Sequence, residues 1–116
     1  MLREMLRSKI HLATVTETVL EYEGSIGIDR ELIDKAGLLP FEKVDVVNVN
    51  NGQRFQTYVI EAPAGSREIS LNGAAAHLAV AGDKVIIMNY GLVEDAEAAN
   101  VKPVILLMDE GNRVKK

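Results

Sequence analysis

The chain has 116 residues, the size of one domain, and its 47% hydrophobic and 26% charged residues exclude a disordered chain. With 13 Lys and Arg against 17 Asp and Glu, the net charge of −4 disfavours a protein that binds nucleic acid or a membrane surface. Because there is no cysteine, disulfides, thiolate-bound metals and cysteine nucleophiles are excluded.

The N-terminal third is predicted to contain a strand and a short helix. Apolar and polar residues alternate from Ser8 to Thr16, as they do in a half-buried strand. A helix is expected from Ile28 to Leu39, because Asp29 can cap its start and Gly37 can end it. Its apolar stripe would consist of Leu32, Ile33 and Ala36.

The middle of the chain carries a clear hairpin pattern. A β-branched segment from Val44 to Val49 leads into the turn Asn50–Gly52, and the segment from Phe55 to Ile60 returns. A short strand is then expected at Ile69–Leu71, followed by an alanine-rich helical turn at Ala74–Val80.

The C-terminal part is predicted to add strands at Lys84–Tyr90 and Lys102–Met108, separated by a polar helical stretch at Glu94–Ala99. Many short strands with brief helices favour a small closed β-barrel, which leaves no exposed sheet edge. No apolar run is long enough to span a bilayer, and the first nine residues are too charged for a signal peptide. We therefore expect a cytoplasmic protein.

Four groups of polar residues are poorly explained by local structure, while familiar nucleotide-binding and hydrolase motifs are missing. The groups are K-I-H at 9–11, Y-E-G-S at 22–25, N-G-Q-R-F-Q-T-Y at 51–58 and N-G-A-A-A-H at 72–77. In this order they closely resemble motifs of the pyruvoyl-dependent aspartate 1-decarboxylase family. The resemblance implies a mainly β fold, a six-stranded double-psi β-barrel with short helices, in a single domain spanning 1–116. It also implies a homotetramer with active sites between subunits.

The same resemblance implies the activity, which is decarboxylation of L-aspartate to β-alanine and CO2 for pantothenate and coenzyme A synthesis. The precursor, a zymogen, would cut itself between Gly24 and Ser25 into a β chain (1–24) and an α chain (25–116). Ser25 would become a covalent pyruvoyl group that forms a Schiff base with the substrate amine, so neither pyridoxal phosphate nor a metal is expected. A glycine before the serine leaves its carbonyl accessible and tolerates a strained backbone. Whether a helper protein assists maturation is left open.

Roles of individual residues also follow from the resemblance. Ser25 and Tyr58 would be catalytic, with Tyr58 as the proton donor, and Thr57 would stabilise the oxyanion during cleavage. An arginine fork suits a carboxylate, and small residues at a helix start leave backbone N–H groups accessible to an anion. The substrate-binding residues would be Lys9, Arg54, Thr57, Gly73, Ala74 and Ala75, supported by His11, Tyr22 and Asn72.

Other interpretations stay open at this stage. Taken singly, Gly24–Ser25 is typical of a turn, Arg54 of a solvated strand charge and Tyr58 of a packing aromatic. The chain could be a non-enzymatic barrel module, or a pyruvoyl decarboxylase for another amino acid, although the cations Arg54 and Lys9 favour a substrate with two carboxylates. In a regular strand Thr57 faces away from Tyr58, so the sequence leaves open whether both serve one site.

Overall fold

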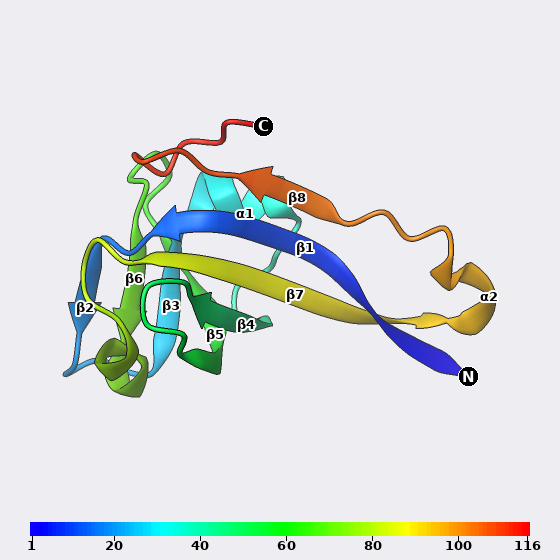
Figure 1. Cartoon of the computed structure of the whole chain (residues 1–116), viewed down its shortest axis with the longest axis horizontal. Helices are drawn as coiled ribbons and strands as arrows, with labels where there is room; N and C mark the ends of the chain where they lie inside the picture. Colours follow the sequence, from blue (N-terminus) through cyan, green and yellow to red (C-terminus); the bar gives the residue numbers. More distant parts are fainter.

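The computed structural model describes residues 1–116 and shows a mainly β fold with eight strands and few short helices (Figure 1). The strands are β1 (Leu2–Thr14), β2 (Glu17–Val19), β3 (Ser25–Asp29), β4 (Lys43–Asn48), β5 (Arg54–Ala62), β6 (Ile69–Asn72), β7 (Lys84–Glu94) and β8 (Val104–Leu107). The helices are α1 (Arg30–Ala36), the 3-10 helix η1 (Gly73–Leu78) and α2 (Asp95–Ala98).

The sheet closes on itself through the junction between β1 and β2. Its strand order is β2-β6-β3-β5-β4-β7-β1-β8, and β2 at one end directly follows β1 along the chain. β1 pairs with β7 as far as Thr14, and two residues later the Thr16 N–H donates to the Ile69 carbonyl of β6 at 2.8 Å. Counting β1 and β2 as one bent strand, six strands form the wall and β8 pairs with β1 outside it. This arrangement agrees with the expected small six-stranded barrel.

Three of the pairings are parallel: β3 with β5 and β2 with β6 in the wall, and β1 with β8 outside it. Parallel neighbours need crossover connections instead of hairpins. Crossovers of this kind belong to the expected double-psi topology. The hairpin between β4 and β5 is confirmed, with Val46 paired to Phe55.

Strand β3 is an element that the sequence does not predict. All five of its residues are buried, because β5 and β6 flank it and both of its faces are covered. A strand buried on both faces lacks the polar alternation that identifies a strand. The helix expected from Ile28 therefore starts later, at Arg30. Its caps are confirmed, since Asp29 accepts the Glu31 N–H and Gly37 ends the helix with φ of +72°.

The barrel is filled almost entirely by aliphatic side chains, as the aromatic-poor composition requires. Twenty buried hydrophobic residues form one cluster, against which Phe55 is half-buried. Completely covered members include Ile10, Ile26, Ile87 and Val46. Each such side chain contributes about 1.5–3 kcal/mol by leaving water, so the core makes the wall around the candidate site rigid.

Strands β1 and β7 are longer than expected and continue beyond the barrel as a two-stranded arm (Figure 1). Leu2 pairs with Glu94 and Leu6 with Tyr90 along this arm, and the ion pair between Arg3 and Asp95 joins it to α2. The arm gives the molecule its long dimension, 43 × 28 × 25 Å. None of the helices has the length and apolar character that a membrane crossing requires.

Candidate active site

A cavity of about 400 Å³ lies where the start of β3 meets η1 and the first half of β5. Its lining consists of Gly24, Phe55, Gln56, Thr57, Tyr58, Ala74, Ala75 and Leu78. Five of these residues, all except Phe55, Gln56 and Leu78, are site residues expected from the sequence. Three distant segments of the chain therefore meet here.

Ser25 begins β3 beside this cavity and is 1% exposed. Its hydroxyl is fixed by two hydrogen bonds, since Oγ accepts from Asn72 Nδ2 at 3.1 Å and donates to the Glu23 carbonyl at 3.2 Å. Asn72 stands at the position before η1, but its side chain makes no capping hydrogen bond. The amide that could have capped the helix holds the Ser25 hydroxyl instead.

Gly73 allows η1 to approach the segment that ends in Gly24. Its φ is +67°, a conformation that favours glycine. A Cβ at this position would lie 2.7 Å from both the Gly24 nitrogen and the Tyr22 carbonyl oxygen. Gly73 is buried and does not line the cavity, whereas Ala74 and Ala75 do. The Tyr22 side chain itself is exposed.

The geometry of β5 bears on the question that the sequence leaves open for Thr57 and Tyr58. The strand runs in unbroken register with β4, and Tyr58 pairs with Lys43 while Thr57 pairs with Val44. The two side chains therefore point to opposite faces, as in any regular strand. Both nevertheless border the same cavity. One site can therefore use both without a bulge in β5.

Lys9, His11 and Arg54 do not line this cavity. They lie on the outer face of the wall formed by β1, β7, β4 and β5, to which Gln56 and Tyr58 also belong. Register places His11, Ile86, Val47 and Arg54 in one row across these four strands. The neighbouring row consists of Lys9, Met88, Asp45 and Gln56. Three strand spacings, about 14 Å, separate the two ends of a row. Within one chain, Lys9 and His11 are therefore not brought to the cavity.

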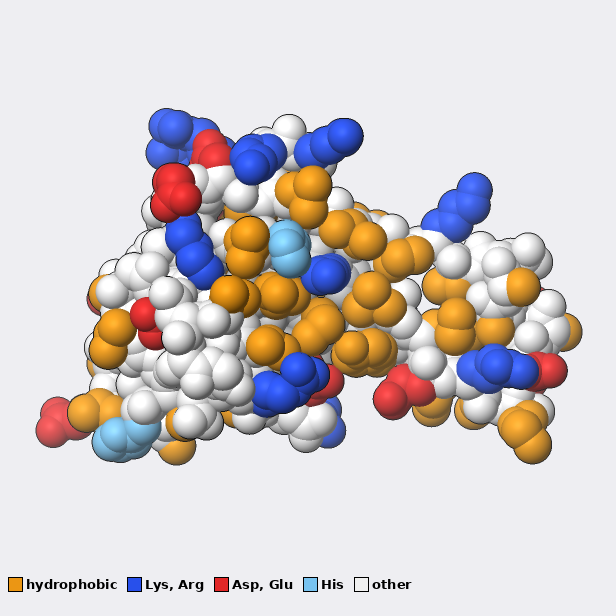
Figure 2. Space-filling view, viewed as in Figure 1, with side chains coloured by type: hydrophobic (Ala, Val, Ile, Leu, Met, Phe, Trp, Pro, Cys, Tyr) orange, Lys and Arg blue, Asp and Glu red, His pale blue; other side chains and the backbone are white.

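This outer face is open for further contacts. None of the six ion pairs of the chain includes Lys9 or Arg54. The buried Nδ1 atom of His11 has no hydrogen-bond partner. Hydrophobic side chains gather over the middle of this face (Figure 2), and Ile105 of β8, which pairs with Lys9, is 45% exposed. This face therefore combines charged and polar groups that have no ion-pair or hydrogen-bond partner in the same chain with exposed apolar surface.

Gln56 is a lining residue that the sequence analysis did not single out. It lies between Arg54 and Tyr58 on the same face of β5, with one residue between each pair. The two-residue period of a strand could have identified it. Phe55 and Leu78 line the cavity as apolar wall, and their sequence positions carry no signal of such a role.

Comparisons with known proteins assign the family. The family model for aspartate decarboxylase matches residues 1–115. The aspartate 1-decarboxylase of Phenylobacterium zucineum (strain HLK1) is 53% identical over 116 residues, covering 100% of this chain and 98% of the relative. That of Chlorobium chlorochromatii (strain CaD3) is 59% identical over 111 residues, covering 96% of this chain and 86% of the relative.

A third relative, the aspartate 1-decarboxylase of Ralstonia nicotianae (strain ATCC BAA-1114 / GMI1000), is 54% identical over 116 residues, covering 100% of this chain and 97% of the relative. The chain is therefore an enzyme of the carboxy-lyase class. It belongs to the aspartate decarboxylase family, which confirms the resemblance seen in the motifs.

Proposed function

We propose that this enzyme converts L-aspartate to β-alanine and CO2 after cutting its own chain between Gly24 and Ser25. The observation that carries the proposal is the buried Ser25 hydroxyl, held by Asn72 directly after a glycine that borders the cavity. The names of the relatives support the substrate. The product would supply pantothenate and coenzyme A synthesis.

The cut would begin with attack of Ser25 Oγ on the Gly24 carbonyl carbon. The bond between that carbon and the Ser25 nitrogen breaks, which leaves an ester, and Thr57 donates a hydrogen bond to the oxyanion on the way. Elimination then releases residues 1–24 with a free carboxylate and leaves dehydroalanine, which water converts to a pyruvoyl group with loss of ammonia. A Cβ built on Gly24 meets nothing closer than the Asn72 carbonyl oxygen at 4.0 Å, so there is space around the attacked bond.

The residues around the cavity fit a pyruvoyl group at position 25. When formed, that group supplies a ketone for the substrate amine and an electron sink for the charge left by CO2 loss. Ala74 and Ala75 leave the backbone of η1 accessible along the cavity, and Thr57 would hydrogen-bond the bound substrate. Tyr58 would donate the proton to the α-carbon of the product.

We also propose that the enzyme is a homotetramer whose active sites lie between subunits. Lys9, His11 and Arg54 occupy an outer face with unpaired cations, an unpaired imidazole nitrogen and exposed apolar surface. If that face of one copy covers the cavity of another, Arg54 and Lys9 reach the substrate carboxylates. The cytoplasmic location expected from the sequence stays a prediction.

Self-cleavage is tested by incubating the purified chain and measuring its products on a denaturing gel and by intact mass. We expect two fragments, 1–24 and 25–116, with a blocked N-terminus on the second, and release of β-alanine from aspartate. Ser25→Ala should fold, stay uncut and be inactive, because the nucleophile is gone.

Each part of the proposal can fail separately in this experiment. Cleavage of the Ser25→Ala chain would show that an external protease makes the cut. A wild-type chain that is cut only after addition of cell extract would require a maturation helper. A chain that stays whole and inactive in extract would favour the non-enzymatic barrel module. Faster CO2 release from another amino acid than from L-aspartate would show that aspartate is not the preferred substrate.

A further inference from the structure

The turn between α1 and β4 holds an aromatic residue in an unfavourable conformation. The Glu42 N–H donates to the Leu39 carbonyl at 3.1 Å, which closes the turn around Pro40 and Phe41. Phe41 has φ of +74°, and a turn position with positive φ favours glycine. Its side chain is 77% exposed, so burial within the chain does not account for a phenylalanine here.

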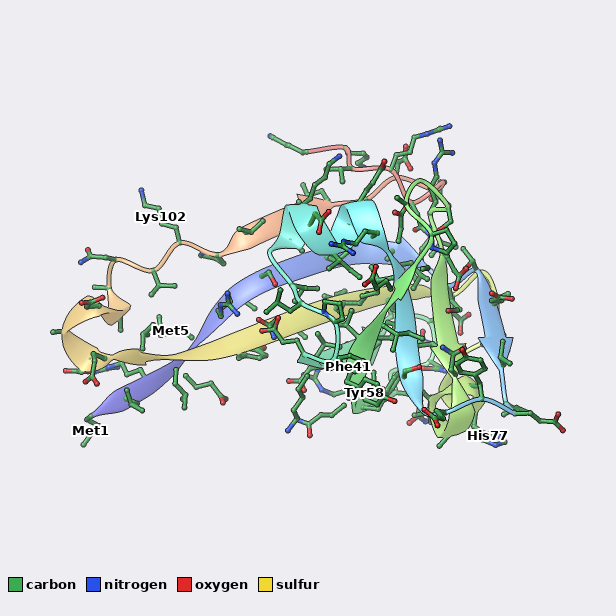
Figure 3. All side chains as sticks on the ribbon, turned by 180° about the vertical axis from the view of Figure 1, so that it is seen from behind. Met1, Met5, Phe41, Tyr58, His77 and Lys102 are labelled. Carbon is green, nitrogen blue, oxygen red and sulfur yellow. The ribbon has the colours of Figure 1, made fainter.

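The exposed ring of Phe41 lies beside Tyr58 (Figure 3). The two ring centroids are 6.2 Å apart with an angle of 30° between the ring planes, within the range of attractive aromatic pairs. The Phe41 N–H donates to the Val59 carbonyl at 2.6 Å, and the Val59 N–H donates to the Glu42 carbonyl at 3.0 Å. The turn is thus attached to β5 at the residue that follows Tyr58.

The turn is also braced from the opposite side, by Arg7 of β1. Arg7 donates to the Glu42 carboxylate at 2.9 Å, and the other oxygen of that carboxylate accepts the Leu39 N–H at 3.0 Å. The stem of Arg7 crosses over Gly91 of β7, where a Cβ would collide with the Arg7 side chain. Two elements, β1 and β5, therefore hold the backbone that presents Phe41, and Gly91 of β7 leaves room for the Arg7 side chain.

We propose that Phe41 is a positioning residue for Tyr58, an inference that rests on the proposed role of Tyr58 as proton donor. Tyr58 borders the cavity and has the Phe41 ring beside it. Proton transfer requires the hydroxyl to stay within hydrogen-bond reach of the α-carbon, so a support that limits ring motion favours the reaction. A phenylalanine kept where glycine is preferred is thereby explained.

The first test measures turnover of mature enzyme. Phe41→Gly removes the ring and suits the positive φ, so we expect kcat to fall by about 10-fold, a part of the 10²–10⁴ that a general acid supplies. KM for aspartate, the extent of self-cleavage and the tetramer should not change, and Tm should not fall. Phe41→Tyr keeps an aromatic ring at this position and should therefore have the kcat of the wild type. Leu39→Ala, at a 68% exposed apolar residue of the same turn, is the matched control and should behave as wild type.

The second test does not depend on activity. The chain has three tyrosines, so their ring resonances can be followed by NMR with ¹³C-labelled tyrosine, and Tyr58→Phe assigns the Tyr58 signal. Phe41→Gly should shift or broaden that signal while the signals of Tyr22 and Tyr90 stay in place. In the Tyr58→Phe background, Phe41→Gly should lower kcat no further, because the group that it positions is already gone.

Several results would overturn the inference: wild-type kcat in Phe41→Gly, an equal fall in Leu39→Ala, an unchanged Tyr58 resonance, or a lower Tm with loss of the tetramer. Failure of the wild-type chain to cut itself or to decarboxylate aspartate would instead refute the proposed function. The NMR measurement reports the contact in either case, so the two failures are distinguishable.

Discussion

Replacing Gly73 by alanine tests whether self-cleavage depends on the close approach of η1 to Gly24. An alanine at φ of +67° costs about 1–2 kcal/mol in backbone conformation. The new Cβ would also lie 2.7 Å from the Gly24 nitrogen and 2.8 Å from its Cα. Ordinary contacts begin at 3.4 Å, so the backbone beside the cut bond must retreat by about 0.7 Å.

The expected effect on cleavage follows from that displacement. A misplacement of 1 Å slows a reaction by about 10²-fold. Gly73→Ala should therefore slow the cut by about 10–100-fold, which corresponds to an activation free energy raised by about 1.4–2.7 kcal/mol. The fraction of cut chain is followed over time by intact mass. The loss of unfolding free energy, about 2–5 kcal/mol from conformation and crowding together, is measured by denaturant unfolding in the uncut Ser25→Ala background.

Gly65→Ala provides the matched control. Gly65 has φ of +82°, but nothing lies within 4 Å of a Cβ built there. This variant should lose only the conformational 1–2 kcal/mol, roughly, and should be cut at the wild-type rate. Equal stability losses in the two variants, with normal cleavage in both, would refute the idea that Gly73 serves to position the bond at Gly24.

Three further predictions concern single groups. Tyr58→Phe should still be cut, but kcat should fall by about 10²–10⁴-fold, and wild-type turnover would make Tyr58 a packing residue. Arg54→Lys loses the bidentate fork, so aspartate should bind about 1.5–3 kcal/mol more weakly, seen as a higher KM with normal cleavage. The pKa of Asp109 is held below its usual range, mainly by the backbone N–H of Arg113 and also by that of Gly111. These hydrogen bonds therefore stabilise the folded chain fully above the unfolded-state pKa of Asp109, and their contribution is lost as the pH falls through its lower folded-state pKa. The protection of the Gly111 and Arg113 amides against hydrogen exchange, relative to the intrinsic rate at each pH, should therefore fall in acid, and Asp109→Asn should remove that dependence.

The parts of the fold that the sequence predicts are those with local signals. Asp29 and Gly37 mark the ends of α1, and the turn after Asn48 marks the hairpin, because capping and turn chemistry depend on neighbouring residues. β3 has no such signal. Its Ser-Ile-Gly-Ile-Asp sequence contains turn-forming residues, and only its central place between β5 and β6 makes it a strand.

The site divides in the same way. The motif order leads to Gly24, Thr57, Tyr58 and the alanines of η1, and the fold collects them around one cavity. The contact of Asn72 with the Ser25 hydroxyl depends on the antiparallel pairing of β3 with β6, which no local pattern specifies. The separation of the Lys9 and His11 pair from the cavity is a property of strand order, which periodicity alone does not reveal.

The long pairing of β1 has a consequence for how the protein can refold. Residues 1–24 contribute eleven paired positions with β7 and the buried Ile10, Ala13 and Val15 to the core. Before a cut after Gly24, folding is a one-chain reaction with a rate independent of dilution. After the cut, the same native state forms only when two separate polypeptides meet, so recovery from denaturation depends on concentration. After maturation the stability of the protein would thus be kinetic, because it would depend on how slowly the N-terminal fragment dissociates.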